Sequence, residues 1–226
     1  MSNPIFNNPQ IAKKIRGVIQ AGASIGEEIP EWNTIGVKNR IFIEPIPDIF
    51  PVLVQNAKPD DKSVFCFNVA LSDYDGEADF HISTGSFCSS SLMDFTPEAK
   101  QYGDELVTER LIKVPVAKLD TLIESKNIPL ENFNCLYVDV QGNEFKMLQG
   151  ALKTLEKMDF LFVEVNHVEI YKDSTLWGQF SEFIKSLGWK LMTIRNHESE
   201  KNNFFVTYQS EALFFNKNIT ADFFKT

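Results

Sequence analysis

Short apolar runs that alternate with helix-like patterns constrain the fold of this chain more than any other feature. Three such runs lie in its first third, at residues 17–21, 41–44 and 64–71, and each has the length of one buried strand. The segments between them, residues 27–34 and 48–57, carry apolar side chains at roughly helical spacing. Strand-helix-strand units join parallel strands through right-handed crossovers. The pattern therefore predicts an α/β fold with helices on both faces of a sheet.

The same alternation returns in the second half of the chain. Residues 135–140 and 160–165 are predicted to be buried strands, and residues 144–155 between them have the spacing of an amphipathic helix. A hairpin is expected near residues 204–208, and it would make the last strand, at residues 211–216, antiparallel to its neighbours. We expect about seven main strands, most of them parallel.

An insertion separates the two halves. Residues 78–82 and 111–116 alternate apolar and polar side chains, which is typical of half-buried antiparallel strands. They flank a polar segment at residues 83–110, and a loop of this length inside a compact domain usually has a function. We expect this segment to be a mobile lid. The length of the chain suits a single domain over residues 1–226, in which residues 1–16 form an N-terminal segment.

The charge and hydropathy of the chain limit its partners. Lys and Arg total 22 against 31 for Asp and Glu, which gives a net charge of -9, so we expect no nucleic acid partner. No stretch approaches the ~20 apolar residues that cross a bilayer, and the N-terminus lacks the apolar run of a signal peptide. We therefore expect a cytoplasmic protein without a membrane span.

The first chemical signal is a strand that runs directly into a glycine turn. The sequence VIQAGASIG, at residues 18–26, contains Gly22 and Gly26 where a backbone or ligand can approach closely. This spacing differs from the G-x-G-x-x-G of dinucleotide folds. Glu44 ends the next predicted strand and is followed by Pro45. A carboxylate at this place can accept hydrogen bonds from both ribose hydroxyls, so the two features together predict an adenosine-containing ligand.

Eight short segments in order make the chain resemble the FkbM family of methyltransferases over about residues 18–216. The segments are VIQAGASIGEE, FIEPIPDIFPVLVQN, NVALSDYDGEADF, CSSSL, VPVAKLDTLI, LYVDVQGNEFKMLQGA, FVEVNHVEIY and EALFFNK. The resemblance implies a class I methyltransferase (Rossmann-like) fold, with a mostly parallel seven-stranded sheet and an antiparallel last strand. It also implies S-adenosylmethionine as methyl donor and O-methylation of a small-molecule or glycan acceptor, such as a sugar or a secondary metabolite.

The resemblance also implies which residues contact the donor. The turn after the first strand would border its methionine part, the end of the second strand would hold its ribose, and an asparagine after the third would lie near its adenine. Gln20 departs from the family, since many members have an acidic residue there, and an amide lacks the charge that would pair with the ammonium group of the donor. The expected donor-binding residues are Gln20, Gly22, Ala23, Ser24, Gly26, Glu44, Pro45 and Asn68.

Asp139, Glu164 and His167 are the candidate catalytic residues. Asp139 begins a segment that matches the D-V-x-G-x-E pattern of the family, and a carboxylate at this edge of the sheet could orient the acceptor or ligate a divalent metal. Glu144 in the same pattern has a simpler interpretation as a charge at the start of a helix. Methyl transfer requires an aligned acceptor and removal of its proton. We favour His167, close to Glu164 in the sequence, as that base.

Two alternative functions stay open. A nicotinamide-dependent oxidoreductase shares the sheet and the acidic strand end, although the glycine spacing and the antiparallel last strand argue against it. A methyltransferase-like binding protein without catalytic activity is the second alternative, and Gln20 is its sole indication.

Overall fold

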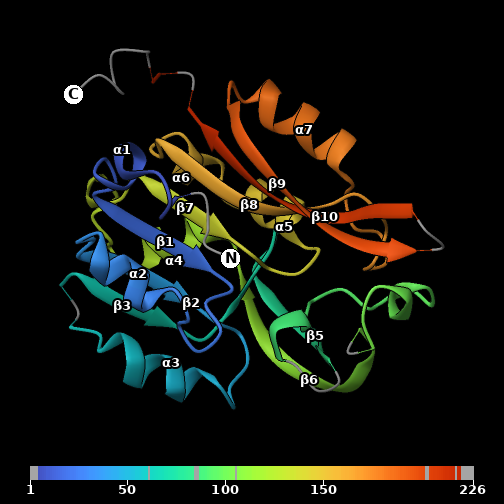
Figure 1. Ribbon diagram of the computed structural model, residues 1–226. Helices are drawn as coiled ribbons and strands as arrows, with labels where there is room; N and C mark the ends of the chain where they lie inside the picture. Colours follow the sequence, from blue (N-terminus) through green and yellow to red (C-terminus); the bar gives the residue numbers. More distant parts are fainter. Residues whose placement is uncertain are drawn as a thin grey trace.

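A seven-stranded sheet forms the centre of the computed structural model (Figure 1). The model describes residues 5–60, 62–83, 87–104, 106–201, 204–216 and 218–219. In spatial order the strands are β3 (Val64–Phe67), β2 (Asn39–Ile43), β1 (Gly17–Ala21), β7 (Cys135–Val138), β8 (Phe160–Asn166), β10 (Phe204–Phe215) and β9 (Lys190–Lys201). Strand β10 is antiparallel to both of its neighbours, and the other pairs are parallel. The predicted seven-stranded, mostly parallel sheet with an antiparallel last strand is confirmed.

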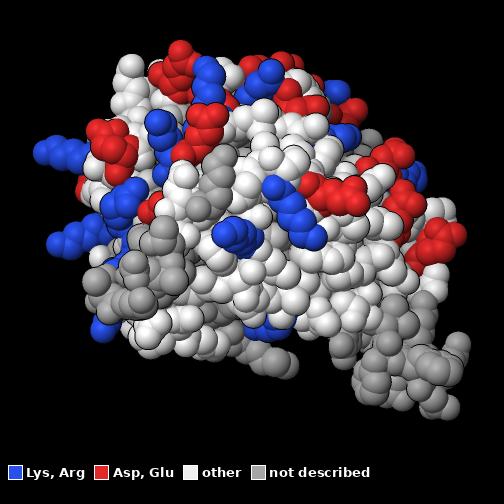
Figure 2. Space-filling view, turned by 90° about the horizontal axis from the view of Figure 1, so that it is seen from above, with Lys and Arg blue, Asp and Glu red and all other residues white. Residues whose placement is uncertain are grey.

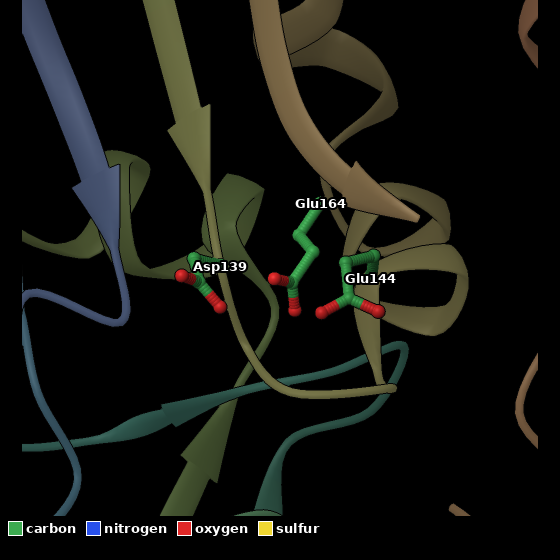
Figure 3. A group of neighbouring side chains, drawn as sticks. All are labelled: Asp139, Glu144 and Glu164. Carbon is green, nitrogen blue, oxygen red and sulfur yellow. The ribbon is translucent and has the colours of Figure 1, made fainter. Parts of the chain in front are cut away.

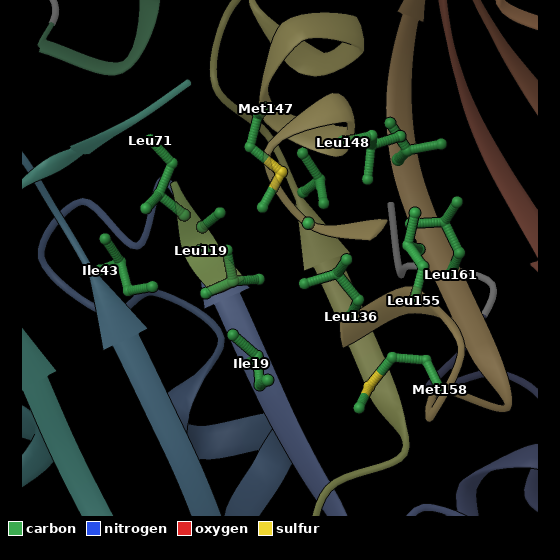
Figure 4. Packing of buried hydrophobic residues seen from close by; sticks show 14 of the residues in the cluster. Ile19, Ile43, Leu71, Leu119, Leu136, Met147, Leu148, Leu155, Met158 and Leu161 are labelled. Carbon is green, nitrogen blue, oxygen red and sulfur yellow. The ribbon is translucent and has the colours of Figure 1, made fainter. Parts of the chain in front are cut away.

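Helices cover both faces of this sheet because its strands are apolar on both sides. Along β1, Val18 packs in a cluster with Trp32 of α2, whereas Ile19 packs with Leu119 of α4 on the opposite face (Figure 4). The first face carries α1 (Pro9–Ala12), α2 (Ile29–Thr34) and α3 (Phe50–Ala57). The second face carries α4 (Leu119–Ser125), α5 (Glu144–Gln149), α6 (Leu152–Leu155) and α7 (Trp177–Ser186).

A second, three-stranded sheet lies beside the first, in the order β4 (Ala70–Leu71), β6 (Thr108–Ala117) and β5 (Gly76–Ser83) (Figure 1). Strands β5 and β6 are antiparallel, as predicted. The prediction of one continuous strand at residues 64–71 is wrong, since β3 belongs to the large sheet and β4 to the small one. Between them the Asn68 side chain donates a hydrogen bond to the carbonyl oxygen of Glu44 at 2.8 Å. This bond links Asn68, where the chain leaves the large sheet for the small one, to the end of β2.

The prediction of one helix at residues 144–155 is also wrong, because α5 ends before Gly150 and α6 starts after it. A Cβ on Gly150 would lie 2.1 Å from the carbonyl oxygen of Ser72, so the chain passes too close to another segment for a side chain. Helix α6 is capped by a residue of α4, because the Asp120 carboxylate accepts hydrogen bonds from the backbone N–H groups of Lys153 and Thr154 at 2.9 and 2.8 Å.

The β9–β10 hairpin extends beyond the rest of the large sheet. Strand β10 pairs with β8 from Gln209 to Phe215, but it begins at Phe204 and pairs with β9 from there. The unshared part of the hairpin therefore forms an arm at the edge where β8 ends (Figure 1). Short 3₁₀ turns occur at η1 (Phe87–Ser89), η2 (Ala99–Gln101) and η3 (Leu130–Asn132).

The surface gives two further observations. On the face drawn in Figure 2, acidic and basic side chains are interspersed around an uncharged area rather than separated by sign. Within the described ranges, the structure contains no helix whose length and apolar character would let it cross a membrane.

Candidate active site

A cavity of about 280 Å³ opens where β1, β2 and β7 end. The carboxyl edge of a parallel sheet is the usual ligand site in such folds, and here the second sheet supplies the facing wall. The residues that line the cavity are Gly22, Ser24, Glu27, Glu28, Ile43, Glu44, Pro45, Ile46, Val69, Ala70, Leu71, Phe80, Phe87, Cys88, Ser90, Leu92, Asp139, Val140 and Asn143. The cavity therefore contains Gly22, Ser24, Glu44 and Pro45 of the predicted donor site, together with residues that sequence analysis did not identify. The other four predicted donor-binding residues, Gln20, Ala23, Gly26 and Asn68, are not among its described lining residues.

The glycine turn is joined to the end of β2 by its own backbone. The N–H groups of Gly22 and Ala23 both donate to the carbonyl oxygen of Ile43 at 3.0 Å, and the N–H of Ser24 donates to Oε2 of Glu44 at 2.9 Å. Gly22 has a left-handed φ of 78°, which glycine adopts at little cost. Because three successive N–H groups are bound within the protein, this turn differs from the turns that cradle phosphates with their backbone.

Glu44 is buried at the wall of the cavity. Besides the bond from Ser24, its Oε1 accepts a hydrogen bond from the N–H of Ile46 at 2.8 Å, and burial raises the pKa of its carboxyl to about 7. Pro45 lines the cavity beside it. Asn68 is not among the described lining residues, and its side chain holds the Glu44 carbonyl. Its predicted contact with adenine stays a prediction.

Gln20 lies beneath the cavity rather than in its wall. The buried amide accepts a hydrogen bond from Nε1 of Trp32 at 3.1 Å and donates one to Oε2 of Glu28 at 2.7 Å. Glu28 does line the cavity, and burial raises the pKa of its carboxyl. Sequence analysis missed Glu28, because one of several acidic residues at the start of a helix gives no signal of its own.

Three carboxylates gather where β7 and β8 end, and Figure 3 shows Glu164 between Asp139 and Glu144. One carboxylate oxygen from each of the three lies within 4.8 Å of the others. Burial is the main cause that raises the pKa of all three, and the carboxyl of Glu144 reaches about 7. The structure therefore brings together Asp139 and Glu164, two of the three candidate catalytic residues, and the negative charge of Asp139 further raises the pKa of Glu164.

Hydrogen bonds within the protein account for this cluster. The amide of Gln141 donates to Asp139 and also to Glu164, the latter at 3.2 Å. Oε1 of Glu144 accepts from the N–H groups of Val140 and Gly142 at 3.1 and 3.0 Å, so Glu144 closes the turn between β7 and α5. Oxygen ligands of this kind suit a hard divalent cation, but these contacts give the cluster a structural explanation, and the metal stays a prediction.

Two rows of polar side chains continue from Glu164 across the neighbouring strands. In the first row, Glu211 forms an ion pair with Arg195. In the second, Gln209 donates to Asn166 at 3.2 Å and to Glu164 at 2.9 Å. The rows are Glu164, Glu211 and Arg195, then Asn166, Gln209 and His197. We call these six residues the polar ladder. Sequence analysis identified only Glu164 among them and missed the other five, although polar residues two apart in a strand share one face.

His167 lies on the opposite face of the sheet from the polar ladder. Its Nε2 is 2.6 Å from the hydroxyl of Ser210, and its ring centroid is 6.1 Å from that of Trp177 in α7. Burial lowers the pKa of its imidazole. Because successive side chains of a strand point to opposite faces, the neighbours Glu164 and His167 are separated by the sheet. The structure does not bring His167 to the cavity, and its role as base stays a prediction.

The segment that was expected to be a lid covers the cavity. Phe87, Cys88, Ser90 and Leu92 contribute to its lining. The same segment is anchored elsewhere, since the Ser91 hydroxyl donates to the carbonyl oxygen of Gln141 at 2.6 Å. Further along, Lys172 forms an ion pair with Asp94 at 2.6 Å, and Phe95 packs against Tyr171. The described part of the segment is therefore a cover, while its movement stays a prediction.

Comparison with known proteins gives matches at the level of family, relatives and fold. A model described as the methyltransferase FkbM domain matches residues 20–191. The chain is similar to the 2-O-methyltransferase NoeI of Sinorhizobium fredii, with 27% identity over 161 residues that cover 69% of this chain and 65% of NoeI. It is also similar to the hexuronic acid methyltransferase AglP of Haloferax volcanii, with 28% identity over 155 residues, or 68% of this chain and 57% of AglP. The matched region thus spans less than two thirds of either relative.

Among solved structures, Sp1610 of Streptococcus pneumoniae, a candidate tRNA methyltransferase, aligns with a TM-score of 0.50 and 9% identity. The alignment covers 100% of this chain and 76% of Sp1610. At this identity the likeness shows a shared fold.

Proposed function

Because this chain belongs to the FkbM family of methyltransferases, we propose that it transfers a methyl group from S-adenosylmethionine to a hydroxyl group of a sugar, a glycan or a related small molecule. One observation carries the choice of donor. The cavity is lined by four carboxylates, those of Glu27, Glu28, Glu44 and Asp139, and no Lys, Arg or His occurs among the described residues of its lining. S-adenosylmethionine has a sulfonium and an ammonium group, so its positive charges match this lining.

The same cavity is a poor site for a nicotinamide dinucleotide. The pyrophosphate of such a cofactor is an anion, and four carboxylates would repel it. The backbone N–H groups of Gly22, Ala23 and Ser24, which a pyrophosphate would need, are bound to the end of β2. This contrast supports the methyltransferase over the oxidoreductase alternative.

We assign the two ends of the donor from the chemistry of the lining. Ile46 after β2, Phe80 of β5 and Leu92 of the covering segment pack in one apolar cluster and form a wall of the cavity that suits an adenine ring. Glu44 adjoins this wall, and each of its oxygens accepts one backbone N–H and has a further lone pair for a ribose hydroxyl. The reacting end of the donor would then lie toward Asp139.

The acceptor is proposed to bind beyond Asp139, along the polar ladder. Carboxylate, amide and guanidinium groups in two rows can bind several hydroxyl groups at defined positions. The activities named for the relatives, 2-O-methylation for NoeI and hexuronic acid methylation for AglP, support a sugar as the acceptor.

The donor, when bound, supplies an activated methyl group whose bond to sulfur breaks as the acceptor oxygen forms its bond to carbon, and the electron pair stays on sulfur. The protein must align the acceptor and take its proton. Asp139 is the group we assign to this proton, because it lines the cavity and stands beside Glu164. Burial raises the pKa of Asp139, which makes it a stronger base than an exposed carboxylate.

Two measurements test this function. Calorimetric titration with S-adenosylhomocysteine and with NAD⁺ should show binding of the first alone, and binding of NAD⁺ alone would overturn the donor assignment. Transfer of a labelled methyl group to a panel of hexuronic acids and oligosaccharides tests catalysis. Donor binding without transfer to any hydroxyl compound would favour the methyltransferase-like binding protein.

A further inference from the structure

A buried hydrogen-bonded chain connects α2 to the cavity. The indole N–H of Trp32 donates to Gln20, and the amide of Gln20 donates to Glu28 at 2.7 Å. Trp32 and Gln20 are almost completely inaccessible to solvent, whereas Glu28 is partly exposed to the cavity. Both ends of the Gln20 amide are thereby satisfied, so this residue fixes the orientation of the Glu28 carboxylate.

The surroundings of Glu28 favour a cation. Asp139, Glu27 and Glu28 all contribute to the same lining, and the electrostatic interaction between Glu28 and Asp139 helps to raise the pKa of Asp139. Among the described lining residues no basic side chain compensates this charge. The bond from Gln20 occupies one position on the carboxylate, which has further lone pairs for a ligand.

We propose that Glu28 binds the α-ammonium group of the methyl donor and that Gln20 is the positioning residue that holds Glu28 in place. The proposal rests on the proposed function, because it names the partner of one group of S-adenosylmethionine. Gln20 in β1 has no carboxylate, and in this assignment Glu28, the residue directly before α2, supplies one instead. Sulfonium and ammonium would then face different carboxylates, Asp139 and Glu28.

Other carboxylates of the cavity are less suited to this ammonium group. Both oxygens of Glu44 accept backbone N–H groups, and Glu44 adjoins the apolar wall that suits adenine. Glu27 is exposed, and its Oε1 accepts a hydrogen bond from the Ser24 hydroxyl at 3.2 Å. Glu31 provides a matched control, because it is an exposed glutamate of α2, three residues after Glu28, and lies outside the described lining of the cavity.

The test combines a substitution with a truncated ligand. S-adenosylhomocysteine has the ammonium group, and 5′-methylthioadenosine lacks the amino acid part while it retains adenine and ribose. Calorimetric titration measures the binding of both ligands to the wild-type protein, to Glu28→Gln and to Glu31→Gln. The substitution Glu28→Gln is nearly isosteric, so it should not change the shape of the cavity. Binding of 5′-methylthioadenosine checks that the cavity is intact in each variant.

Glu28→Gln should weaken S-adenosylhomocysteine binding by roughly 10- to 100-fold, which is the range for a lost charge-assisted hydrogen bond, and should leave 5′-methylthioadenosine binding nearly unchanged. Glu31→Gln should change the affinity for neither ligand by a comparable factor. Equal losses for both ligands, or no loss for S-adenosylhomocysteine, would overturn the role of Glu28. Failure of the wild-type protein to bind either ligand would instead remove the proposed function, and this assignment with it.

Discussion

The carbonyl oxygen of Asp139 lies 1.7 Å from the point that a Cβ would occupy on Gly22. The ends of β1 and β7 can therefore meet only where residue 22 has no side chain. This close approach brings Asp139, a candidate catalytic residue, to the turn that borders the proposed donor site. The relative position of the two proposed sites therefore depends on the absence of a side chain at Gly22.

Gly22→Ala should lower the free energy of unfolding by clearly more than the same change at Gly36. Both residues have φ of 78°, but nothing lies within 4 Å of a Cβ on Gly36. Gly36→Ala therefore costs about 1–2 kcal/mol for the left-handed backbone, whereas Gly22→Ala adds a collision with the backbone carbonyl of Asp139, directly after β7. Urea unfolding of both variants measures the difference, and equal losses would contradict the close approach.

Glu44→Gln should weaken binding of S-adenosylhomocysteine and of 5′-methylthioadenosine alike, because both ligands contain the ribose assigned to Glu44. A lost charge-assisted bond corresponds to about 1.5–3 kcal/mol. Asp48→Asn is a suitable control, since Asp48 is exposed and pairs with Arg110 outside the described lining. Unchanged affinity for both ligands in Glu44→Gln would refute the placement of the ribose.

The raised pKa of Glu44 predicts how stability changes with pH. Its carboxyl titrates near 7 in the folded protein against 4.5 ordinarily, so as pH rises through this window the unfolded chain ionises first. The contribution of Glu44 is therefore fully present below pH 4.5 and is lost toward pH 7, by up to about 3 kcal/mol. Unfolding free energies at pH 5 and pH 8 should differ less in Glu44→Gln than in the wild type. The same pH dependence in both proteins would argue against a buried, titrating Glu44.

Asp139→Asn should reduce turnover by roughly 10²–10⁴-fold, the usual contribution of a general base, with donor binding largely retained. His167→Ala should have a much smaller effect, because its imidazole contacts Ser210 on the other face of the sheet. Single-turnover rates and S-adenosylhomocysteine affinities of both variants decide the question. If His167→Ala is inactive and Asp139→Asn is active, the base is the histidine that the sequence favoured.

Ligand binding should slow hydrogen exchange in residues 87–104, since Phe87, Ser90 and Leu92 line the cavity and closure would exclude water from the reacting centre. Exchange followed by mass spectrometry, with and without S-adenosylhomocysteine and an acceptor sugar, measures this effect. Peptides from α4, on the far face of the sheet, provide the reference. Identical exchange of the segment in both states would show that it is a fixed cover.

The sheet could be predicted from sequence because its determinants are local. The run at Gly17–Ala21 is buried at every position, and the predicted strand agrees with β1 at both ends. Glu44 was found for the same reason, since the end of a buried strand marks the edge of the sheet. Local pattern was sufficient wherever a residue's neighbours in the chain determined its environment.

Other features depended on contacts between distant segments. Gly150 interrupts a helix because it touches the backbone at Ser72, and residues 72 and 150 show no relation in the sequence. His167 was favoured over Asp139 because it follows Glu164 closely, but strand alternation puts the two on opposite faces. Glu28 becomes visible only when Gln20 and Trp32 are seen together.

The arm formed by β9 and β10 can change in length without disturbing the rest of the large sheet. Strand β10 meets β8 from Gln209 onward, so residues added or removed before that point shift no pair within the rest of the sheet. Lengthening a surface hairpin costs little conformational entropy. The arm stands at the same edge as the polar ladder (Figure 1). A change in its length would therefore alter the surroundings of the proposed acceptor site and leave the proposed donor site intact.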